Sequence, residues 1–408
     1  MRSILILFLM LIAFSCKQDA KQMVSMQEDV AYLAADSLMG RETGTSYEML
    51  AASYLADRFK HLGLEAKGTD GYIQEFTFKP TLNPHEQAEV VEGSGTGTLT
   101  GRNVIGYIDN NAETTVVIGA HYDHLGMGGQ GSLHRGGDAI HNGADDNASG
   151  VAVMLKLARD LREKNPNNNY LFIAFSGEEM GLLGSNYFVK NPTVDLAQVT
   201  YMINMDMVGR LNEENTLAVH GVGTSPVWKQ TLFANNDAGL NIAEHESGIG
   251  PSDHTSFYIM DIPVLHFFTG QHGDYHKPTD DADKLNYTGM ETIANYILNI
   301  ITDLDDNEKL AFRKTKNESE DVPSFKVTLG VIPDYLYTGE GMRIDGVSED
   351  RPAVKAGLQK GDIVKKMGEH DVTDMMSYMK SLSKFEPGQT AVVTVERDGK
   401  LMEVSVTF

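Results

Sequence analysis

The chain has 408 residues, which corresponds to two or three domains at about 150 residues per domain. Its 34 basic and 57 acidic residues give a formal net charge of −23, and 41% of the residues are hydrophobic. The acidic balance argues against nucleic acid and against an anionic membrane surface as electrostatic partners. The hydrophobic fraction is ordinary for a globular protein with a core.

The first 16 residues predict an export signal. Arg2 is followed by an apolar run over 4–14 and then by Ser15-Cys16, and the run is too short for a membrane-spanning helix. Cys16 is the only cysteine of the chain, and its position resembles the lipobox of bacterial lipoproteins, in which the cysteine is lipidated. We expect an exported lipoprotein, anchored through Cys16 and facing the periplasm or the cell exterior. An ordinary cleaved signal peptide is the alternative, and in both cases the exported chain would have no disulfide bond.

Segments with helical periodicity follow a polar tether over 17–25. Helices are expected at 26–37, 46–62, 148–164 and 287–304. Gly63 stands directly after the second of these segments, where glycine commonly ends a helix.

Short apolar runs alternate with these helices and determine the fold class. The alternating segment at 72–78 predicts a half-buried strand, and near-continuous apolar runs lie at 103–108, 115–120, 170–175, 199–205 and 262–268. Apolar strands that alternate with helices predict an α/β fold with three layers, in which helices cover both faces of a mostly parallel sheet. In such sheets ligands bind just beyond the carboxyl ends of the strands.

The C-terminal part of the chain predicts a second unit. Residues 307–324 lose the apolar periodicity and gather charge, which indicates a linker. Strand-like segments follow, which predict a small β-rich domain. The expected organisation is a signal peptide over 1–16, a tether over 17–25, an α/β domain over 26–306, a linker over 307–324 and the β-rich domain over 325–408.

Histidines and carboxylates follow five segments at the sheet edge where ligands should bind. They are His121 and Asp123, Asp145 and Asp146, Glu178 and Glu179, Asp206, and His276. Carboxylates gathered in a partly dry site repel one another unless a cation neutralises them. Imidazole and carboxylate ligands without thiolate suit zinc, and their number exceeds the need of one tetrahedral ion. The set predicts two metal ions bridged by a carboxylate.

The adjacent glutamates Glu178 and Glu179 allow two interpretations. Acidic residues are favoured in the first turn of a helix, so the pair could be a solvated helix start. Alternatively, because neighbouring side chains point in different directions, the two carboxylates could have different roles at one site.

The motifs HYDH, GADDNASG, SGEEMGLLGS, NMDMVG and YHKPTDD, in this order, resemble the co-catalytic dizinc aminopeptidases of metallopeptidase family twenty-eight, the bacterial leucyl aminopeptidase and aminopeptidase Y group. The segment GRETGTSYEMLAASYLADRFKHLGLE is similar to the N-terminal helices of that family, so the resemblance covers 26–305. It implies a zinc exopeptidase fold of the phosphorylase/hydrolase-like type. It also implies a secreted exopeptidase with two Zn²⁺ per chain that hydrolyses the N-terminal peptide bond of peptides.

The resemblance implies five metal ligands on this sequence. One zinc ion would be held by His121 and Asp206, and the other by Glu179 and His276. Asp146 would bridge the two ions.

The same resemblance implies roles for the neighbouring residues. Glu178 would be the general base that takes a proton from a water between the ions, and Asp123 would accept the other ring N–H of His121. Asp145 is the rival of Asp146 as the bridge, and the family pattern favours the second aspartate. In the family the peptide bond after the bridging aspartate is cis, so we expect a cis bond at Asp146-Asn147.

Further residues are candidates for contact with substrate. The segment SDHTSF resembles a family segment that lines the substrate cleft, which places His254 and Phe257 there, although a structural role for His254 is as well supported. Three histidines of the glycine-rich loop at 124–144 are expected to contact substrate, if anything, rather than metal: His124, His134 and His141.

The segments KVTLGVIPDY, RPAVKAGLQKGDIV and AVVTVERDGKLMEVSV resemble a PDZ domain of bacterial protease type over 325–408. The resemblance implies that the loop with Leu329, Gly330 and Val331 binds the carboxylate of a peptide or protein C-terminus through backbone N–H groups, while the peptide adds as a strand. The alternative is that this domain packs on the catalytic domain and binds nothing.

Other functions on the same scaffold stay open at this point. They are a carboxypeptidase, a glutaminyl cyclase, a non-catalytic peptide-binding relative, and a scaffold dominated by the PDZ-like domain. The cyclases keep one zinc ion, a non-catalytic relative would have substitutions at ligand positions, and a scaffold has no reason to retain Glu178. The intact ligand set therefore favours an aminopeptidase. Peptides are the expected partners, with no nucleic acid and with no membrane contact beyond the lipid anchor.

Overall fold

A computed structural model of the chain describes residues 24–81, 88–129, 131–162, 164–306, 308–315, 326–334, 336–337, 339–347 and 351–408. The predicted signal peptide with Cys16, and the tether up to residue 23, lie outside the described residues. None of the helices in these ranges combines the length and the apolar character that crossing a membrane requires.

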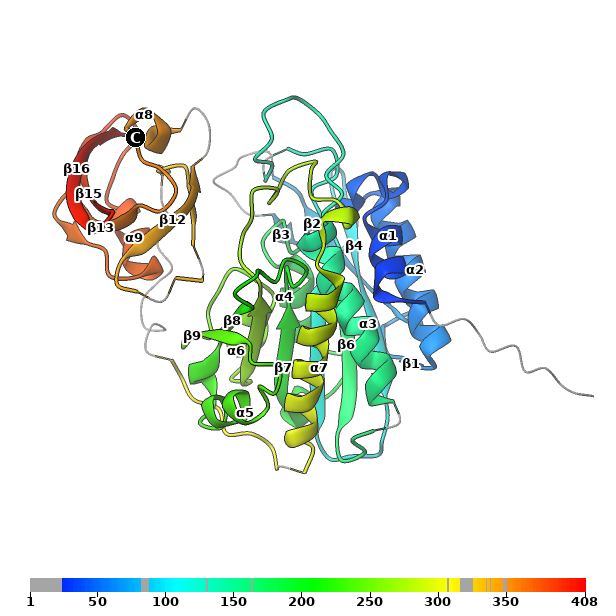
Figure 1. Cartoon of the computed structure of the whole chain (residues 1–408). Helices are drawn as coiled ribbons and strands as arrows, with labels where there is room; N and C mark the ends of the chain where they lie inside the picture. The colour runs from blue at the N-terminus through cyan, green and yellow to red at the C-terminus, as the bar shows by residue number, and fades with distance from the viewer. Residues whose placement is uncertain are drawn as a thin grey trace, which may run out of the picture.

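A ten-stranded sheet forms the centre of the larger unit (Figure 1). Its strand order is β3-β2-β4-β6-β5-β7-β10-β8-β9, and β1 pairs with β4. The strands are β1 (Glu65–Ala66), β2 (Ile73–Lys79), β3 (Glu89–Val90), β4 (Leu99–Ile108), β5 (Thr115–His121), β6 (Asn169–Phe175), β7 (Val199–Met205), β8 (Thr216–His220), β9 (Asn241–His245) and β10 (Val264–Phe268).

The middle of this sheet is parallel and its flanks are mixed. Strands β6, β5, β7 and β10 are parallel neighbours, whereas β4 and β8 pair antiparallel with β6 and β10. Every residue of the four parallel strands is buried, as the continuous apolar runs predict for strands that are covered on both faces. The predicted α/β fold with a mostly parallel sheet is confirmed.

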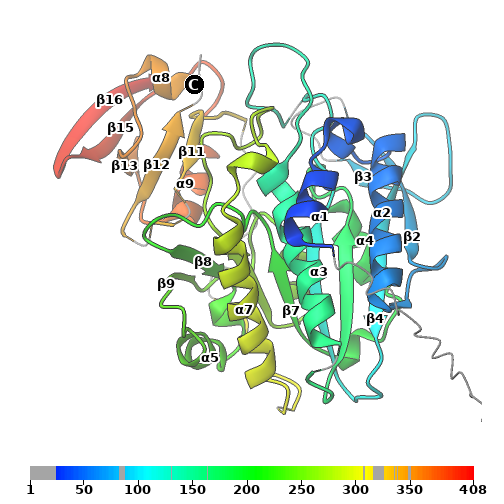
Figure 2. The same cartoon turned by 45° about the vertical axis from the view of Figure 1, so that its right-hand side comes forward.

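Helices cover both faces of the sheet (Figure 2). On one face lie α1 (Met26–Leu33), α2 (Ser46–Leu62), α3 (Gly150–Leu161), α5 (Trp228–Ala234) and α7 (Tyr287–Asp303). On the other face lie α4 (Leu183–Lys190) and α6 (His254–Tyr258). Along β5, Val116 and Ile118 belong to the first of these cores and Val117 to the second, because successive side chains of a strand point to opposite faces.

Local sequence signals explain where several helices begin and end. The helix expected at 46–62 is confirmed: the Thr45 side chain accepts the N–H of Glu48 at its start, and Gly63 ends it in the left-handed region at φ 76°. The helix expected at 26–37 is shorter, because a separate turn over Asp36–Arg41 follows α1.

The helix expected at 148–164 begins two residues later than predicted. The preceding residues form a separate turn over Ala144–Ser149, in which the Asp146-Asn147 peptide bond is cis. The cis bond predicted at this position is confirmed. Further short turns lie at Leu196–Gln198, Val222–Thr224 and Ala282–Lys284.

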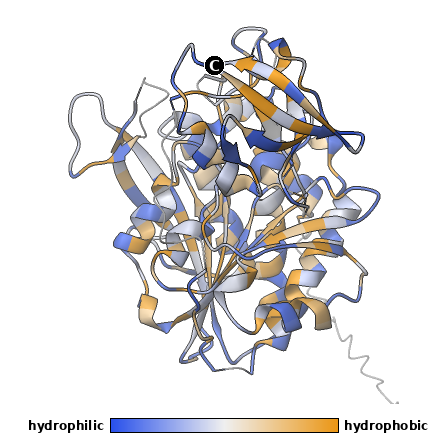
Figure 3. Cartoon of the chain, turned by 90° about the vertical axis from the view of Figure 1, so that its left-hand side faces the viewer, coloured by the Kyte–Doolittle hydropathy of each residue, from blue (hydrophilic) through white to orange (hydrophobic). Residues whose placement is uncertain are grey.

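The smaller C-terminal unit is built on an antiparallel sheet of order β11-β12-β13-β15-β16, with β14 paired to β13. Its strands are β11 (Val331–Pro333), β12 (Met342–Val347), β13 (Ile363–Met367), β14 (His370–Asp371), β15 (Thr390–Arg397) and β16 (Lys400–Thr407), and its helices are α8 (Pro352–Lys355) and α9 (Met375–Leu382). Hydrophobic and hydrophilic residues are interspersed along these strands (Figure 3). The unit has a hydrophobic core of its own, as the predicted β-rich domain requires.

The described part of the segment between the two units lies against the larger one. The N–H of Leu310 donates to Thr200 Oγ1 at 3.0 Å, and the N–H of Arg313 donates to the carbonyl of Thr224 at 2.8 Å. Phe312 packs on Tyr258 with ring centroids 5.4 Å apart. Residues 308–315 are therefore held on the larger unit before the chain enters the smaller one.

Candidate metal centre

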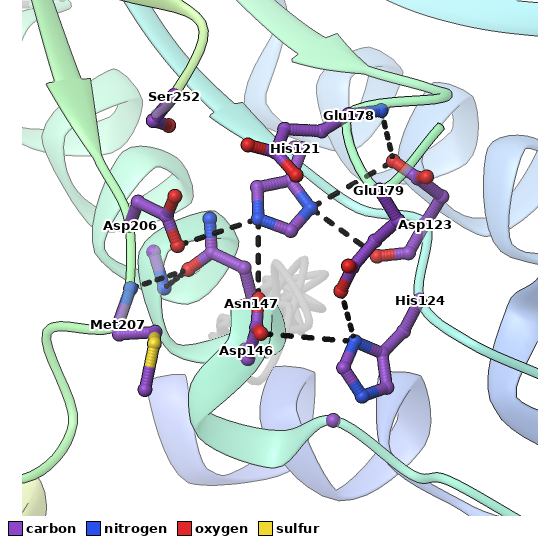
Figure 4. A network of polar contacts seen from close by, with 12 residues as sticks. His121, Asp123, His124, Asp146, Asn147, Glu178, Glu179, Asp206, Met207 and Ser252 are labelled. Carbon is purple, nitrogen blue, oxygen red and sulfur yellow. Dashed lines mark hydrogen bonds and ion pairs between the residues drawn. The ribbon is translucent and has the colours of Figure 1, made fainter. Parts of the chain in front are cut away.

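Polar side chains gather where the central parallel strands end (Figure 4). His121 is the last residue of β5, Glu178 and Glu179 follow β6, and Asp206 follows β7. Adjacent parallel strands end at the same edge of a sheet, so residues far apart in the sequence come together there.

Asp146 lies between two sets of donor atoms. Its Oδ1 is 3.3 Å from His121 Nε2, and its Oδ2 is 3.2 Å from His276 Nε2. His121 Nε2 is in turn 3.3 Å from Asp206 Oδ1, and His276 Nε2 is 3.2 Å from Glu179 Oε2. The two oxygens of Asp146 thus face different imidazoles, which is the arrangement that a bridging carboxylate needs.

Asp145, the rival candidate for the bridge, is used elsewhere. Its Oδ1 accepts the N–H of Gly209 at 2.6 Å, and its Oδ2 is 3.1 Å from His272 Nε2. Asp280 Oδ2 accepts the N–H groups of both Asp145 and Asp146, at 2.9 Å and 3.1 Å. Asp280 thereby fixes the backbone that presents Asp146.

Two groups of donor atoms, each within 4.8 Å of one another, occur in the described ranges: His121 with Glu178 and Asp206, and His124 with Asp146 and Glu179. Four carboxylates at such distances repel one another, and divalent cations would balance their charge. Imidazole and carboxylate donors without thiolate suit zinc. The residues present therefore fit two zinc ions.

His124 is a site residue that the sequence analysis missed, because histidines of the glycine-rich loop were not expected to bind metal. Its ring is buried, and its Nδ1 is 2.7 Å from Glu179 Oε1. Within the described part of the chain, neither of these two atoms has a hydrogen-bond partner of acceptable geometry. They face a common point, as two ligands of one ion do. Its position could have indicated this role, because His124 follows the predicted ligand His121 by only three residues in the motif HYDH.

The two adjacent glutamates have opposite electrostatic environments. Desolvation raises the pKa of Glu178 well above its usual range, His121 opposes this, and Asp206 adds to it. Desolvation also acts to raise the pKa of Glu179, but His276 and other charges nearby lower it to about 2. One carboxyl is thus suited to take up a proton and the other to stay ionised, which is how neighbouring acids come to have different roles.

Asp123 holds the ring of His121 through its main chain. His121 Nδ1 lies 3.2 Å from the carbonyl oxygen of Asp123, whereas the nearer carboxylate oxygen is 3.7 Å away. The carboxylate instead accepts the hydroxyl of Thr43 at 3.0 Å and the N–H of Glu178 at 3.2 Å. Asp123 therefore connects the orientation of the imidazole to the backbone of the predicted base.

Comparison with protein-family models identifies both units. Residues 103–301 match the model of peptidase family M28, and residues 310–408 match that of a PDZ domain. The chain carries an M28 peptidase domain followed by a PDZ domain.

Curated proteins and solved structures also resemble the chain. Aminopeptidase YwaD of Bacillus subtilis is 29% identical over 192 residues, which cover 45% of this chain and 39% of that protein. The Legionella pneumophila LapA aminopeptidase matches 70% of this chain and 71% of its own, with 21% identity and a TM-score of 0.54. Bacteroides thetaiotaomicron glutaminyl cyclase bound to N-acetylhistamine matches 70% of this chain and 97% of its own, with 20% identity and a TM-score of 0.54.

These similarities differ in what they show. At 21% and 20% sequence identity, the two solved structures show a shared fold. The chain spans between 39% and 57% of the length of the first three curated relatives it matches.

Replacing His124 of the M28 domain with alanine is expected to weaken zinc binding by about 10- to 100-fold, the range found when a residue that supports a metal ligand is removed. The physical reason is that Glu179 Oε1 loses the ring nitrogen that lies 2.7 Å away. Chelator competition measures the affinity. The control is His134→Ala in the same loop, because His134 is only half-buried and belongs to neither donor group. Equal zinc affinity in the two variants would contradict the role given to His124.

Arg41 connects the loops around the candidate metal centre through its buried side chain. Its guanidinium is fully buried and donates to the carbonyls of Tyr122 at 2.5 Å, Gly143 at 2.7 Å and Leu33 at 3.0 Å, and also to that of Asn142. Burial lowers the pKa of Arg41 to about 10, so the side chain stays charged at neutral pH. One side chain thus fixes both the residue after His121 and the residues just before Asp145.

A cavity of about 110 Å³ opens beside the predicted ligands. It is lined by Asp146, Glu178, Glu179, Asp206, Met207, His220, Pro251, His266, Phe268, Gln271, Tyr275 and His276. The prediction that Phe257 lies in the substrate cleft is corrected by the structure. Phe257 is fully buried in the core below α6, with ring centroids 6.0 Å from Phe175 and 5.9 Å from Phe188, because α6 turns this residue toward the sheet.

His254 is not among the residues that line the cavity, but it belongs to a row of four histidines of which two, His220 and His266, do line it. Ring centroids are 4.5 Å apart between His254 and His266, 5.4 Å between His266 and His220, and 4.2 Å between His220 and His245. His266, His220 and His245 are neighbours in the registers of β10, β8 and β9, and His254, the first residue of α6, stacks on His266. Burial lowers the pKa of His254 and of His266 to about 3, so both rings are neutral at pH 7.

The neutral pair His254 and His266 is expected to make the M28 domain labile to acid. The unfolded chain takes up a proton at each of these rings below about pH 6.5, whereas His254 stays neutral in the folded chain down to about pH 3. Stability is therefore lost as the pH falls, by about 1.4 kcal/mol per pH unit for each such histidine. Urea unfolding between about pH 4 and about pH 7 measures the slope. His254→Phe should reduce it and His61→Phe, an exposed position, should not; equal slopes would refute the assignment.

Proposed function

We propose that the protein is a zinc-dependent exopeptidase that hydrolyses the N-terminal peptide bond of peptides. The observation that carries the proposal is Asp146, whose two oxygens face His121 and His276 beside Glu178. Aminopeptidases among its relatives, YwaD and LapA, support the choice of reaction.

The proposed ligand set follows the donor positions. His121 and Asp206 would hold one zinc ion and Glu179 and His276 the other, with Asp146 as the bridge. In addition, the ring of His124 is aimed at the second position and is a candidate for it.

In this proposal the zinc ions, when bound, polarise the peptide carbonyl and lower the pKa of a water molecule. Glu178 is the group of this chain that moves the proton: it accepts one from the attacking water and passes it to the leaving amine. Burial raises its pKa from the usual carboxyl range, which is the direction that favours uptake of a proton. The N–H of Glu178 donates to Asp123 Oδ1 at 3.2 Å, which holds the base in place.

The test is hydrolysis of a panel of aminoacyl-nitroanilides and N-acetylated peptides by the zinc-loaded and the metal-stripped protein. Cleavage of free-amine substrates alone, lost on stripping and restored by zinc, is the expected result. Because the fold is shared with a glutaminyl cyclase, the panel includes an N-terminal glutaminyl peptide. Its cyclisation without cleavage, or release of C-terminal residues only, would overturn the aminopeptidase assignment in favour of a cyclase or a carboxypeptidase. A protein that binds these peptides without turnover would be a non-catalytic relative.

Two further proposals concern where the protein acts and what else it binds. We propose export and lipid anchoring at Cys16, supported by the sequence of residues 1–16. We also propose that the PDZ domain binds a peptide or protein C-terminus beside Leu329, Gly330 and Val331. In support, β11 lies at one end of the strand order, where an added strand would pair, and Gly330 turns the chain at φ 75°. The N–H of Gly330 already donates to Thr328 Oγ1 at 3.0 Å, so a bound carboxylate would have to displace that hydroxyl.

A further inference from the structure

One side chain of the PDZ domain packs on the M28 domain next to the candidate metal centre. Leu336, between β11 and β12, packs against a small hydrophobic cluster that contains Met207 and Phe268, and Tyr275 packs against the same cluster. A methyl group built on Gly270 would lie 2.8 Å from Leu336 Cδ1, so the leucine occupies the space that this glycine leaves open. Figure 2 shows the PDZ domain beside β8 and β9, which contribute the remaining members of the cluster.

Two members of this cluster, together with Tyr275, form one wall of the cavity. Met207, Phe268 and Tyr275 all line the space that also borders the metal-ligand candidates. Leu336 itself is not among the lining residues. It therefore supports the outer side of the wall rather than its inner surface.

This wall is uncharged, whereas the carboxylates that line the cavity are those of the metal-ligand candidates and Glu178. His220 and His266 stand beside Phe268, and burial lowers the pKa of both imidazoles, which keeps them neutral. A cavity of about 150 Å³ holds a benzene molecule, so the 110 Å³ found here suits a side chain somewhat smaller than that ring. An apolar side chain of a substrate would fit against the uncharged wall.

The position of Leu336 is fixed from within the PDZ domain. Its N–H donates to Asp334 Oδ1 at 2.9 Å, and Arg343 Nε donates to Asp334 Oδ2 at 2.6 Å. The guanidinium of Arg343 also lies over the ring of Tyr337, 4.8 Å from its centroid. Residues 308–315, at the start of the connection between the domains, are held on the M28 domain.

We propose that the PDZ domain is part of the specificity pocket of the peptidase, with Leu336 as a positioning residue that holds Phe268 and Tyr275 against the N-terminal side chain of the substrate. The inference rests on the proposed function and adds to it a second domain that takes part in the choice of the N-terminal side chain. A PDZ domain that merely follows the peptidase along the chain would have no effect on the choice of side chain.

The experiment compares kcat and KM for alanyl-, valyl- and leucyl-nitroanilide in the full-length zinc-loaded protein. Leu336→Ala is expected to lower kcat/KM for the two larger substrates by about tenfold, mainly through KM, and to change the alanyl substrate less than about twofold. Leu336→Met should restore the profile because methionine has a similar volume. The control is Leu401→Ala, which removes an equal side chain from the PDZ domain at a position that is 69% exposed. Parallel profiles for Leu336→Ala and Leu401→Ala would overturn the inference.

A second measurement separates this inference from the proposed function. If the zinc-loaded wild type cleaves no substrate, the proposed function fails, and calorimetric binding of leucine hydroxamate and glycine hydroxamate then decides the role of Leu336. A preference for leucine hydroxamate that drops about tenfold in Leu336→Ala supports the inference. An unchanged preference, or no binding of either hydroxamate to the zinc-loaded protein, overturns it.

Discussion

Replacing Glu178 with glutamine is expected to lower kcat by about two to four orders of magnitude while two zinc ions remain bound. The amide keeps the size of the side chain but cannot take up a proton, so only the proton transfer is lost. Glu179, next in the chain, has its pKa lowered to about 2 and stays ionised, so it cannot replace the missing base. Initial rates with a leucyl substrate and metal analysis of the same sample measure both quantities.

The control for this variant is Glu75→Gln on β2, whose side chain is 59% exposed. It should leave kcat unchanged. Loss of zinc together with activity in Glu178→Gln would contradict the assignment, because it would make Glu178 a ligand of the group with His121 and Asp206 instead of the base.

The second large effect is expected for Asp146→Asn. The amide offers one oxygen in place of two, so the variant should lose the link between the two donor sets, with zinc affinity weakened by more than about a hundredfold and no detectable turnover. Asp146 Oδ1 faces His121 and Oδ2 faces His276, so the measurement has to resolve the binding of each zinc ion separately. Titration of the metal-free protein with zinc follows both binding steps.

Asp138→Asn is the matched control, because Asp138 is an exposed aspartate in the loop that precedes the site. Both zinc-binding steps should be unchanged in it. If Asp146→Asn weakens only one of the two steps, Asp146 serves a single ion and the bridged pair of zinc ions is wrong.

The layers of the fold and the edge that carries the site could be predicted from local patterns. The apolar runs at 115–120, 170–175 and 199–205 lie within strands that are buried along their whole length, since only a strand covered on both faces can be apolar throughout. The polar residues that follow these runs then had to meet at one edge. The short strands β8 and β9 were not predicted, because five residues with mixed polarity give too little periodicity.

The sequence by itself determined the α/β class and the polar residues at the strand ends, because each depends on periodicity or on position along the chain. The cis bond after Asp146 and the PDZ-like unit were predicted from the resemblance of motifs to known families. Only the tertiary structure decided that His124 faces Glu179, that Phe257 belongs to the core and that Leu336 supports the cavity wall. These three depend on contacts between segments distant in sequence, and the direction of a side chain across such a contact is set by packing rather than by any local pattern.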